Sequence, residues 1–136
     1  MPNLNISSER VCFLIVKARE FDVQDVAADE SSGSNASDDR MVDVLEEHAD
    51  NPVVEEIRAF VDALDDDAKA DLIALMQLGR GDGTFEDWEA LRDQGFREHG
   101  GRLVNYLLGQ PLLGDYLEEG LSQFGFSCAE FEIGRL

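Results

Sequence analysis

The stretch DDDAKADLIALMQLGRG, residues 65–81, decides the fold because it contains a whole helix with a start and an end. Its leading aspartates favour a helix start, since acidic side chains interact well with the positive end of the helix dipole. Gly79 and Gly81 stand at the far end, and glycine commonly supplies the left-handed residue that ends a helix. Between these signals apolar side chains recur at helical spacing: Leu72, Ile73, Leu75, Met76 and Leu78. The stretch therefore predicts one amphipathic helix.

The same kinds of signal recur on both sides of this helix. Asn51 can cap a helix that Pro52 begins, and Thr84 can cap another with Asp87 three residues later. Further helices are expected at residues 41–48, 53–64, 85–99, 103–108 and 113–124, the last ended by Gly125, and in a tail whose start Ser127 and Glu130 can cap. No hairpin signal and no internal repeat is present. The sequence predicts an all-α fold, a single bundle of about six to seven short helices.

The N-terminal segment has two interpretations. Apolar side chains in residues 7–21 follow helical spacing, and Ser7 can cap the helix. The run VCFLIV, residues 11–16, also suits a buried strand, because a short apolar run rich in β-branched residues does not distinguish the two. We favour a helix, since the chain offers no second strand to pair with it.

Residues 22–40 differ from the rest of the chain in composition. Residues 27–40, AADESSGSNASDDR, contain no large apolar side chain, so this part cannot bury enough surface to offset the entropy of ordering it. The composition predicts a flexible acidic linker. The expected organisation is an N-terminal helix at 1–21, the linker at 22–40 and a helical domain at 41–136, and the place where the N-terminal helix docks stays open.

The charge balance excludes some classes of partner. The chain of 136 residues has 30 acidic and 11 basic side chains, a net charge of -19. Nucleic-acid binders neutralise phosphates with Lys and Arg, so direct nucleic-acid binding is not expected. An anionic membrane surface is disfavoured for the same reason, and the longest apolar run is far shorter than the roughly 20 residues of a membrane span. We expect a cytoplasmic protein whose Cys12 and Cys128 are reduced packing residues.

The segment LGRGDGTFEDWE, residues 78–89, partly resembles a calcium-binding loop. With Gly83 as the turn glycine, Asp82 and Glu89 fall at ligand positions, and Glu86 lies between them. Leu78 and Arg80 occupy two positions that need oxygen ligands, so these three carboxylates are weak metal candidates and we expect no metal and no other cofactor. A glycine-rich helix end followed by a threonine cap explains the same residues.

No catalytic constellation stands out. His48 and His99 are the only histidines, and neither belongs to a pattern typical of an activated nucleophile or a zinc site. An enzyme or ligand-binding site near residues 79–89 is the alternative, with His99 acting as a base beside Asp115 or Glu118. Such a site would draw on Arg80, Asp82, Trp88, His99 and Asp115. The sequence leans away from enzymatic activity.

The run YLLGQPLLGDYLEE, residues 106–119, is the densest apolar stretch. Core packing is one explanation of it. The other is an interaction surface, because the run supplies more apolar side chains than one helix stripe needs. The expected contact residues are Tyr106, Leu108, Pro111, Leu112 and Tyr116.

Several stretches resemble a family of short, mainly alphaproteobacterial proteins, domain of unknown function 3775. They are VCFLIVKAREFDVQD, GSNASDD, DNPVVEE, LGRGDGT, YLLGQPLLGDYLEEGL and FSCAEFE, and together they span most of the chain. The resemblance implies a small helical cytosolic protein, and it implies no activity, cofactor or catalytic residue. Our leading hypothesis is therefore a non-enzymatic module that binds another protein or a second copy of itself.

Overall fold

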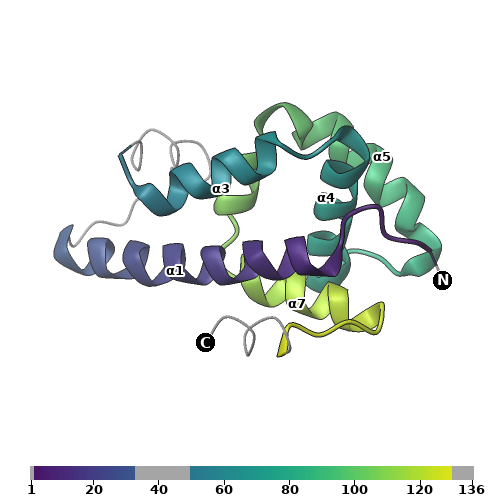
Figure 1. Cartoon of the computed structure of the whole chain (residues 1–136). Coiled ribbons are helices and arrows are strands. Elements are labelled where there is room, and N and C mark those ends of the chain that lie inside the picture. The colour runs from purple at the N-terminus through teal and green to yellow at the C-terminus, as the bar shows by residue number, and fades with distance from the viewer. Residues whose placement is uncertain (1, 33–49, 130–136) are drawn as a thin grey trace.

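A computed structural model describes residues 2–32 and 50–129, with side chains for 2–24 and 50–129. Every regular element in these ranges is helical, which confirms the predicted all-α class (Figure 1). The helices are α1 (Ser8–Ser32), α3 (Pro52–Asp62), α4 (Asp66–Arg80), α5 (Trp88–His99), α6 (Leu103–Leu108) and α7 (Leu113–Gln123), with short 3-10 helices η1 (Phe85–Asp87) and η2 (Gly100–Arg102). None of the described helices is long and apolar enough to cross a membrane.

Helix α4, the helix expected from the first stretch quoted above, lies at the centre of the fold. Asp65 caps it by accepting a hydrogen bond from the Ala68 amide at 2.9 Å, and Gly81 ends it with a φ of 92°. Both ends thus form as the sequence predicts. The helix is buried on most of its circumference because α5 and α7 pack against it. Its buried residues are Ala68, Ala70, Asp71, Leu72, Ile73, Ala74, Leu75, Met76 and Leu78.

Glycines allow α4 and α7 to approach at backbone distance. A Cβ atom on Gly79 would lie 1.8 Å from the Tyr116 carbonyl oxygen, and one on Gly120 would lie 2.4 Å from the Leu75 carbonyl oxygen. Gly79 was expected to help end the helix, but it lies inside α4, and only Gly81 has a positive φ there. The role of Gly79 is close packing, which a single sequence does not reveal.

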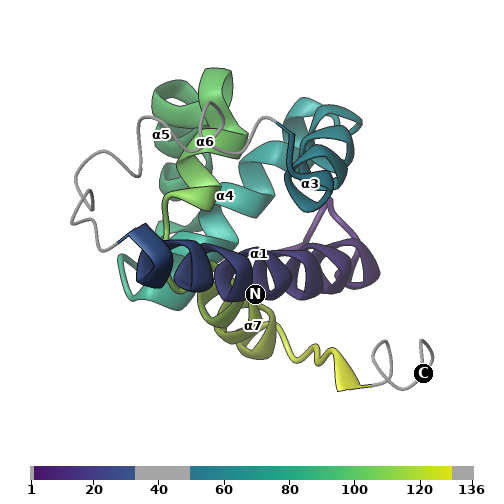
Figure 2. The same ribbon diagram turned by 90° about the vertical axis from the view of Figure 1, so that its left-hand side faces the viewer.

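Helix α1 packs on its own chain, which answers where the N-terminal segment docks. It lies antiparallel along α7 and also contacts α3, and Figures 1 and 2 both show α7 beneath it. The helical interpretation of residues 7–21 is confirmed, and the strand alternative is wrong. The buried side chains of α1 are Val11, Cys12, Leu14, Ile15, Ala18 and Phe21.

The predicted end of this helix at residue 21 is wrong, because α1 continues to Ser32. Residues 22–32 contain no glycine or proline, and Gly33 is the first helix-breaking residue after Ser8. The side chain of Gln24 accepts a hydrogen bond from Asn51 at 2.7 Å, which ties the extension to the start of α3. The linker therefore does not begin at residue 22. The remainder of the expected linker and the stripe at residues 41–48, with His48, lie outside the described residues.

Cys12 and Cys128 form a disulfide, with their Cα atoms 5.6 Å apart. The expectation of two reduced thiols is wrong in this structure. The two residues are 116 positions apart in sequence, and only the antiparallel packing of α1 on α7 brings them together. Spacing in the sequence gave no sign of this pairing.

The other predicted caps can be checked in part. Thr84 and Asp87 form the expected capping box, although the turn that they cap is the 3-10 helix η1 before α5. Gly125, with a φ of 87°, follows α7 as expected. The Ser127 hydroxyl accepts a hydrogen bond from the Ala129 amide at 3.1 Å, and its expected partner Glu130 lies outside the described residues.

Candidate functional site

The structure does not bring the three weak metal candidates together. Asp82 accepts hydrogen bonds from Arg80, with its Oδ2 atom 2.5 Å from Nη2 and 3.0 Å from Nε. Glu89 pairs with Arg92 at 3.2 Å, and Glu86 is exposed on η1. In the part of the chain that the structure describes, no three Asp, Glu, His or Cys residues are grouped as a metal site requires. The sequence of residues 78–89 thus resembles a calcium loop, but the fold does not arrange its carboxylates as such a loop does.

A polar cluster forms where α4 ends, and it includes part of the predicted ligand site. Arg80 donates to the Gln110 carboxamide oxygen at 2.8 Å, and Gln77 donates to the Tyr106 hydroxyl at 3.2 Å. The hydrogen bond to Asp82 is the main cause of a raised pKa of Arg80, with a smaller contribution from Tyr106 and an opposing one from burial. Arg80 is therefore a permanent cation that joins the end of α4 to α6 and to the turn that follows it.

His99 borders this cluster by stacking on Tyr106. The ring centroids are 3.6 Å apart and the planes are 7° from parallel. Burial lowers the pKa of His99, the Arg80 charge lowers it further, and Glu98 opposes both. The imidazole is therefore neutral at neutral pH, where it acts as an aromatic packing surface for Tyr106.

The remaining residues of the predicted enzyme site lie elsewhere. Asp115 and Glu118 both accept hydrogen bonds from Arg19 of α1, at 2.9 and 3.0 Å, so neither is the expected partner of His99. Trp88 is only 2% exposed and packs edge-on against Phe124, at 5.0 Å between ring centroids. The five residues of the alternative site are thus divided among three places.

Among the described residues, the most buried charge is one that the sequence analysis missed. Asp71 is fully buried in α4 and accepts hydrogen bonds from the backbone amides of Asn5 and Ile6 and from the Arg92 Nε atom, the last at 2.7 Å. Burial is the largest single influence on the pKa of Arg92 and lowers it. The hydrogen bond to Asp71, the Asp71 charge and hydrogen bonds to Asp67 and Glu89 together outweigh burial, so the pKa of Arg92 is raised. This ion pair fastens the N-terminal segment and α5 to α4. The signal available in the sequence was an aspartate within an apolar helix stretch.

The predicted interaction residues divide into buried and exposed members. Leu108 is 2% exposed and belongs to the core, so its assignment to an interaction surface is wrong. Tyr106 and Tyr116 are half-buried and pack against the core. Pro111 is exposed, and Leu112 exposes 51% of its surface. We call these last two residues, which form the turn before α7, the Pro111–Leu112 corner.

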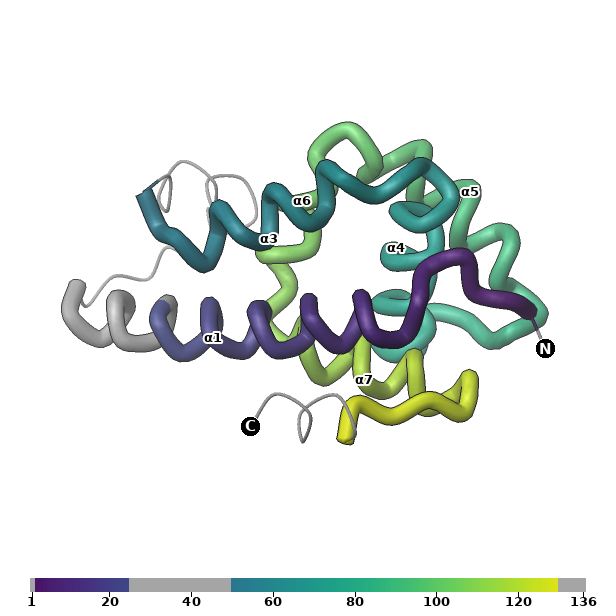
Figure 3. The backbone as a smooth tube through the Cα atoms, viewed as in Figure 1, coloured from purple at the N-terminus to yellow at the C-terminus, as the bar shows by residue number. Residues whose placement is uncertain are grey.

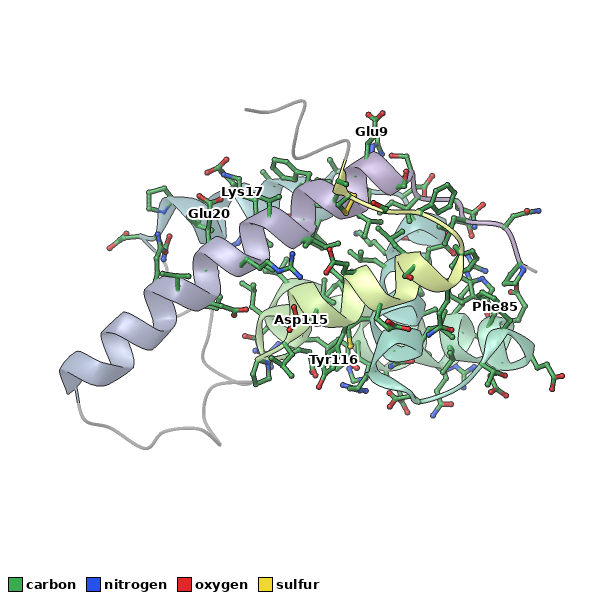
Figure 4. The ribbon with its side chains drawn as sticks, turned by 90° about the horizontal axis from the view of Figure 1, so that it is seen from below. Glu9, Lys17, Glu20, Phe85, Asp115 and Tyr116 are labelled. Carbon is green, nitrogen blue, oxygen red and sulfur yellow. A yellow bond between two sulfur atoms is a disulfide. The ribbon has the colours of Figure 1, made fainter. Side chains whose placement is uncertain are left out.

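Acidic side chains lie next to this corner on α7. Asp115 and Tyr116 stand near the start of the helix, with α1 alongside (Figure 4). α7 carries three acidic side chains and no basic one, and Arg19 pairs with two of the three, Asp115 and Glu118. Val23, 72% exposed, lies one turn beyond Arg19 on α1, toward the same end of α7 because the helices are antiparallel. An exposed apolar corner with an acidic border results.

Comparison with known proteins identifies the family of this chain. Residues 54–126 match the model of a family described as a protein of unknown function, DUF3775. The chain belongs to this family. The matched region includes nearly all of α3 and continues through α7, and so it contains the polar cluster, the buried Asp71–Arg92 pair and the Pro111–Leu112 corner. No curated protein and no solved structure matches the chain.

Proposed function

We propose that this protein is a non-enzymatic interaction module whose Pro111–Leu112 corner binds a basic segment of another protein. The observation that carries this proposal is the exposure of Leu112, because most large apolar side chains among the described residues are buried or half-buried. Among the described residues, the large apolar side chains with the greatest exposure are Val23, Leu112 and Phe126. An exposed apolar side chain on a turn next to a packed helix is a suitable anchor for a partner.

The charge of the chain supports a basic partner. The corner is bordered by the acidic side chains of α7 on a body with a net charge of -19. Complementary charge speeds association and suppresses wrong partners, and salt weakens both effects. The same charge disfavours self-association, because two copies would bring like-charged surfaces together.

Site-specific crosslinking tests the proposal. A photoreactive amino acid at position 112 should capture one basic protein in cells of the native host, and the same group at Ala90, exposed on α5, should not. With the purified pair, Leu112→Asp should weaken binding by about tenfold or more, which is the scale of one well-packed apolar anchor. Ala90→Asp is the matched control because it adds the same charge away from the corner. Raising the salt from about 50 to about 500 mM should also weaken binding, mainly by slowing association.

Two results would contradict the proposal. One is an adduct that forms equally at positions 112 and 90. The other is binding that Leu112→Asp leaves unchanged. A second copy of the chain is the alternative occupant of the corner, and light scattering of the full chain tests it. A dimer that Leu112→Asp dissociates would show that a second copy, and not a basic partner, binds at the corner.

The cellular compartment is linked to the cysteine pair. A cytoplasmic location, expected from the sequence, requires that Cys12 and Cys128 be reduced in most cases, because cytosolic thiols are kept reduced. The disulfide in the structure weighs in the opposite direction. Alkylation of free thiols in intact cells decides the question: labelled cysteines support a cytoplasmic protein, and protected cysteines support an oxidising compartment.

A further inference from the structure

The second feature with a binding geometry is a pocket near the start of α4, whereas Gly79 lies near the end of that helix. It has a volume of about 240 Å³. α3 and α4 contribute to one wall, and η2 with the start of α6 forms the other. α6 lies close to α3 here (Figure 3). The described residues that line the pocket are Arg58, Val61, Asp62, Lys69, Gly100, Gly101, Arg102, Leu103 and Val104.

The charge of this lining is opposite to that of the whole protein. Three cationic side chains, Arg58, Lys69 and Arg102, face one carboxylate, Asp62, among the described lining residues. The chain as a whole has 30 acidic and 11 basic side chains. The three cations come from three separate elements, α3, α4 and η2, so their gathering is a product of the fold.

Two of the pocket cations, Arg58 and Lys69, are weakly paired within the part of the chain that the structure describes. Elsewhere, Lys17 lies 3.0 Å from Glu56 and Arg19 lies 2.9 Å from Asp115. At the pocket, Arg58 pairs loosely with Glu55, at 3.9 Å and beyond hydrogen-bond distance, and Lys69 makes no ion pair with any described residue. Like charges that are held together repel one another, and a bound anion would relieve that repulsion.

The shape and floor of the pocket limit the size of a ligand. Val61, Leu103 and Val104 are almost fully buried and supply apolar surface beneath the cations. Gly101 has no heavy atom within 4 Å of the position of a Cβ atom, so its backbone faces open space. Drug-sized ligands occupy pockets of roughly 300–1,000 Å³, and this pocket is smaller.

We propose that this pocket binds a small oxyanion, a phosphate or carboxylate group carried on a short apolar body. Arg58 and Lys69 hold the anionic group by charge-assisted hydrogen bonds. The apolar floor accommodates the short body of the ligand. This site is independent of the Pro111–Leu112 corner, and neither proposal requires the other.

Amide NMR of the full chain tests the pocket directly, with inorganic phosphate as the probe at constant ionic strength. The amide signals of Gly100 and Gly101 should shift and saturate, while those of Gly81 and Gly125, which do not line the pocket, should not. Lys69→Gln and Arg58→Gln should each raise the dissociation constant by about tenfold, the loss expected for one hydrogen bond to a charged group. Arg97→Gln is the matched control, because Arg97 is exposed on α5, has no ion pair with any described residue and does not line the pocket.

A parallel titration with succinate separates the two sources of an oxyanion. Saturation by phosphate alone identifies a phosphate site, and saturation by succinate alone identifies a carboxylate site. Shifts that do not saturate with either probe overturn the proposal. So does a dissociation constant that Lys69→Gln and Arg58→Gln leave unchanged while both variants keep the helical circular dichroism of the parent.

Discussion

The two sides of α4 differ in how closely they are packed. Toward α7, α4 makes backbone-distance contact at Gly79, and toward α5 its Asp71 is fully buried against Arg92. Toward α3 and η2, the packing leaves a pocket of about 240 Å³ lined by cations. We call these the closed side and the open side.

The difference indicates which side of α4 contributes most to the stability of the fold and which side has space for a ligand. Close packing and satisfied buried hydrogen bonds stabilise the closed side. The open side retains like charges that cost stability, which is typical of binding sites. Substitutions on the closed side should therefore lower the free energy of unfolding strongly. Matched substitutions on the open side or the surface should change it little.

The largest effect is expected at Asp71. Asp71→Ala leaves the Arg92 guanidinium and the amides of Asn5 and Ile6 without their buried acceptor, which should lower the free energy of unfolding by about 3–5 kcal/mol. Asp67→Ala is the matched control, because Asp67 also pairs with Arg92 but is 76% exposed, and it should cost at most about 1 kcal/mol. Urea denaturation measures both. Equal costs would mean that Asp71 is not buried in solution.

Reduction of the disulfide should have the next largest effect. The Cys12–Cys128 bond joins residues 116 positions apart in sequence. A cross-link over that length reduces the conformational entropy of the unfolded chain. Dithiothreitol should therefore lower the free energy of unfolding by about 2–4 kcal/mol. A variant with both cysteines replaced by alanine should unfold at the same urea concentration with or without the reductant. No response of the parent protein would show that the bond is absent.

These two predictions concern features that the sequence did not disclose, and the reason is physical. Helix starts and ends depend on neighbouring residues, so Asp65, Gly81 and the Thr84–Asp87 box could be predicted. The contacts of Asp71 with Asn5 and of Cys12 with Cys128 join residues far apart in the chain. They depend on how α1 and α7 pack, which local patterns do not specify. For the same reason, the Pro111–Leu112 corner was predicted within a dense apolar run, while the cation pocket was not.

Gly79 tests the closed side in a third way. Gly79→Ala places a methyl group against the Tyr116 carbonyl oxygen and should cost about 1–3 kcal/mol, since α4 and α7 must separate. Gly101→Ala on the wall of the open side meets no atom within 4 Å and should change stability by less than about 0.5 kcal/mol. Urea midpoints compare the two. A small cost for Gly79→Ala would show that the seam is not tightly packed.

His99 lies next to the boundary between the two sides, and its titration should give the smallest effect. Burial lowers the pKa of His99 in the folded protein, so around the ordinary histidine pKa of about 6.5 the unfolded chain binds more protons. The stability that the neutral ring contributes is therefore complete above that pKa, and it is lost as the pH falls toward the lowered folded value. Because the carboxylates of the chain also titrate in acid, the informative quantity is a difference. Between about pH 7.5 and 5.5, the urea midpoint of the parent should fall more than that of His99→Gln, which cannot gain this proton. Equal falls would mean that His99 is solvated, and the stacked contact with Tyr106 would then not hold the wall of the open side in place.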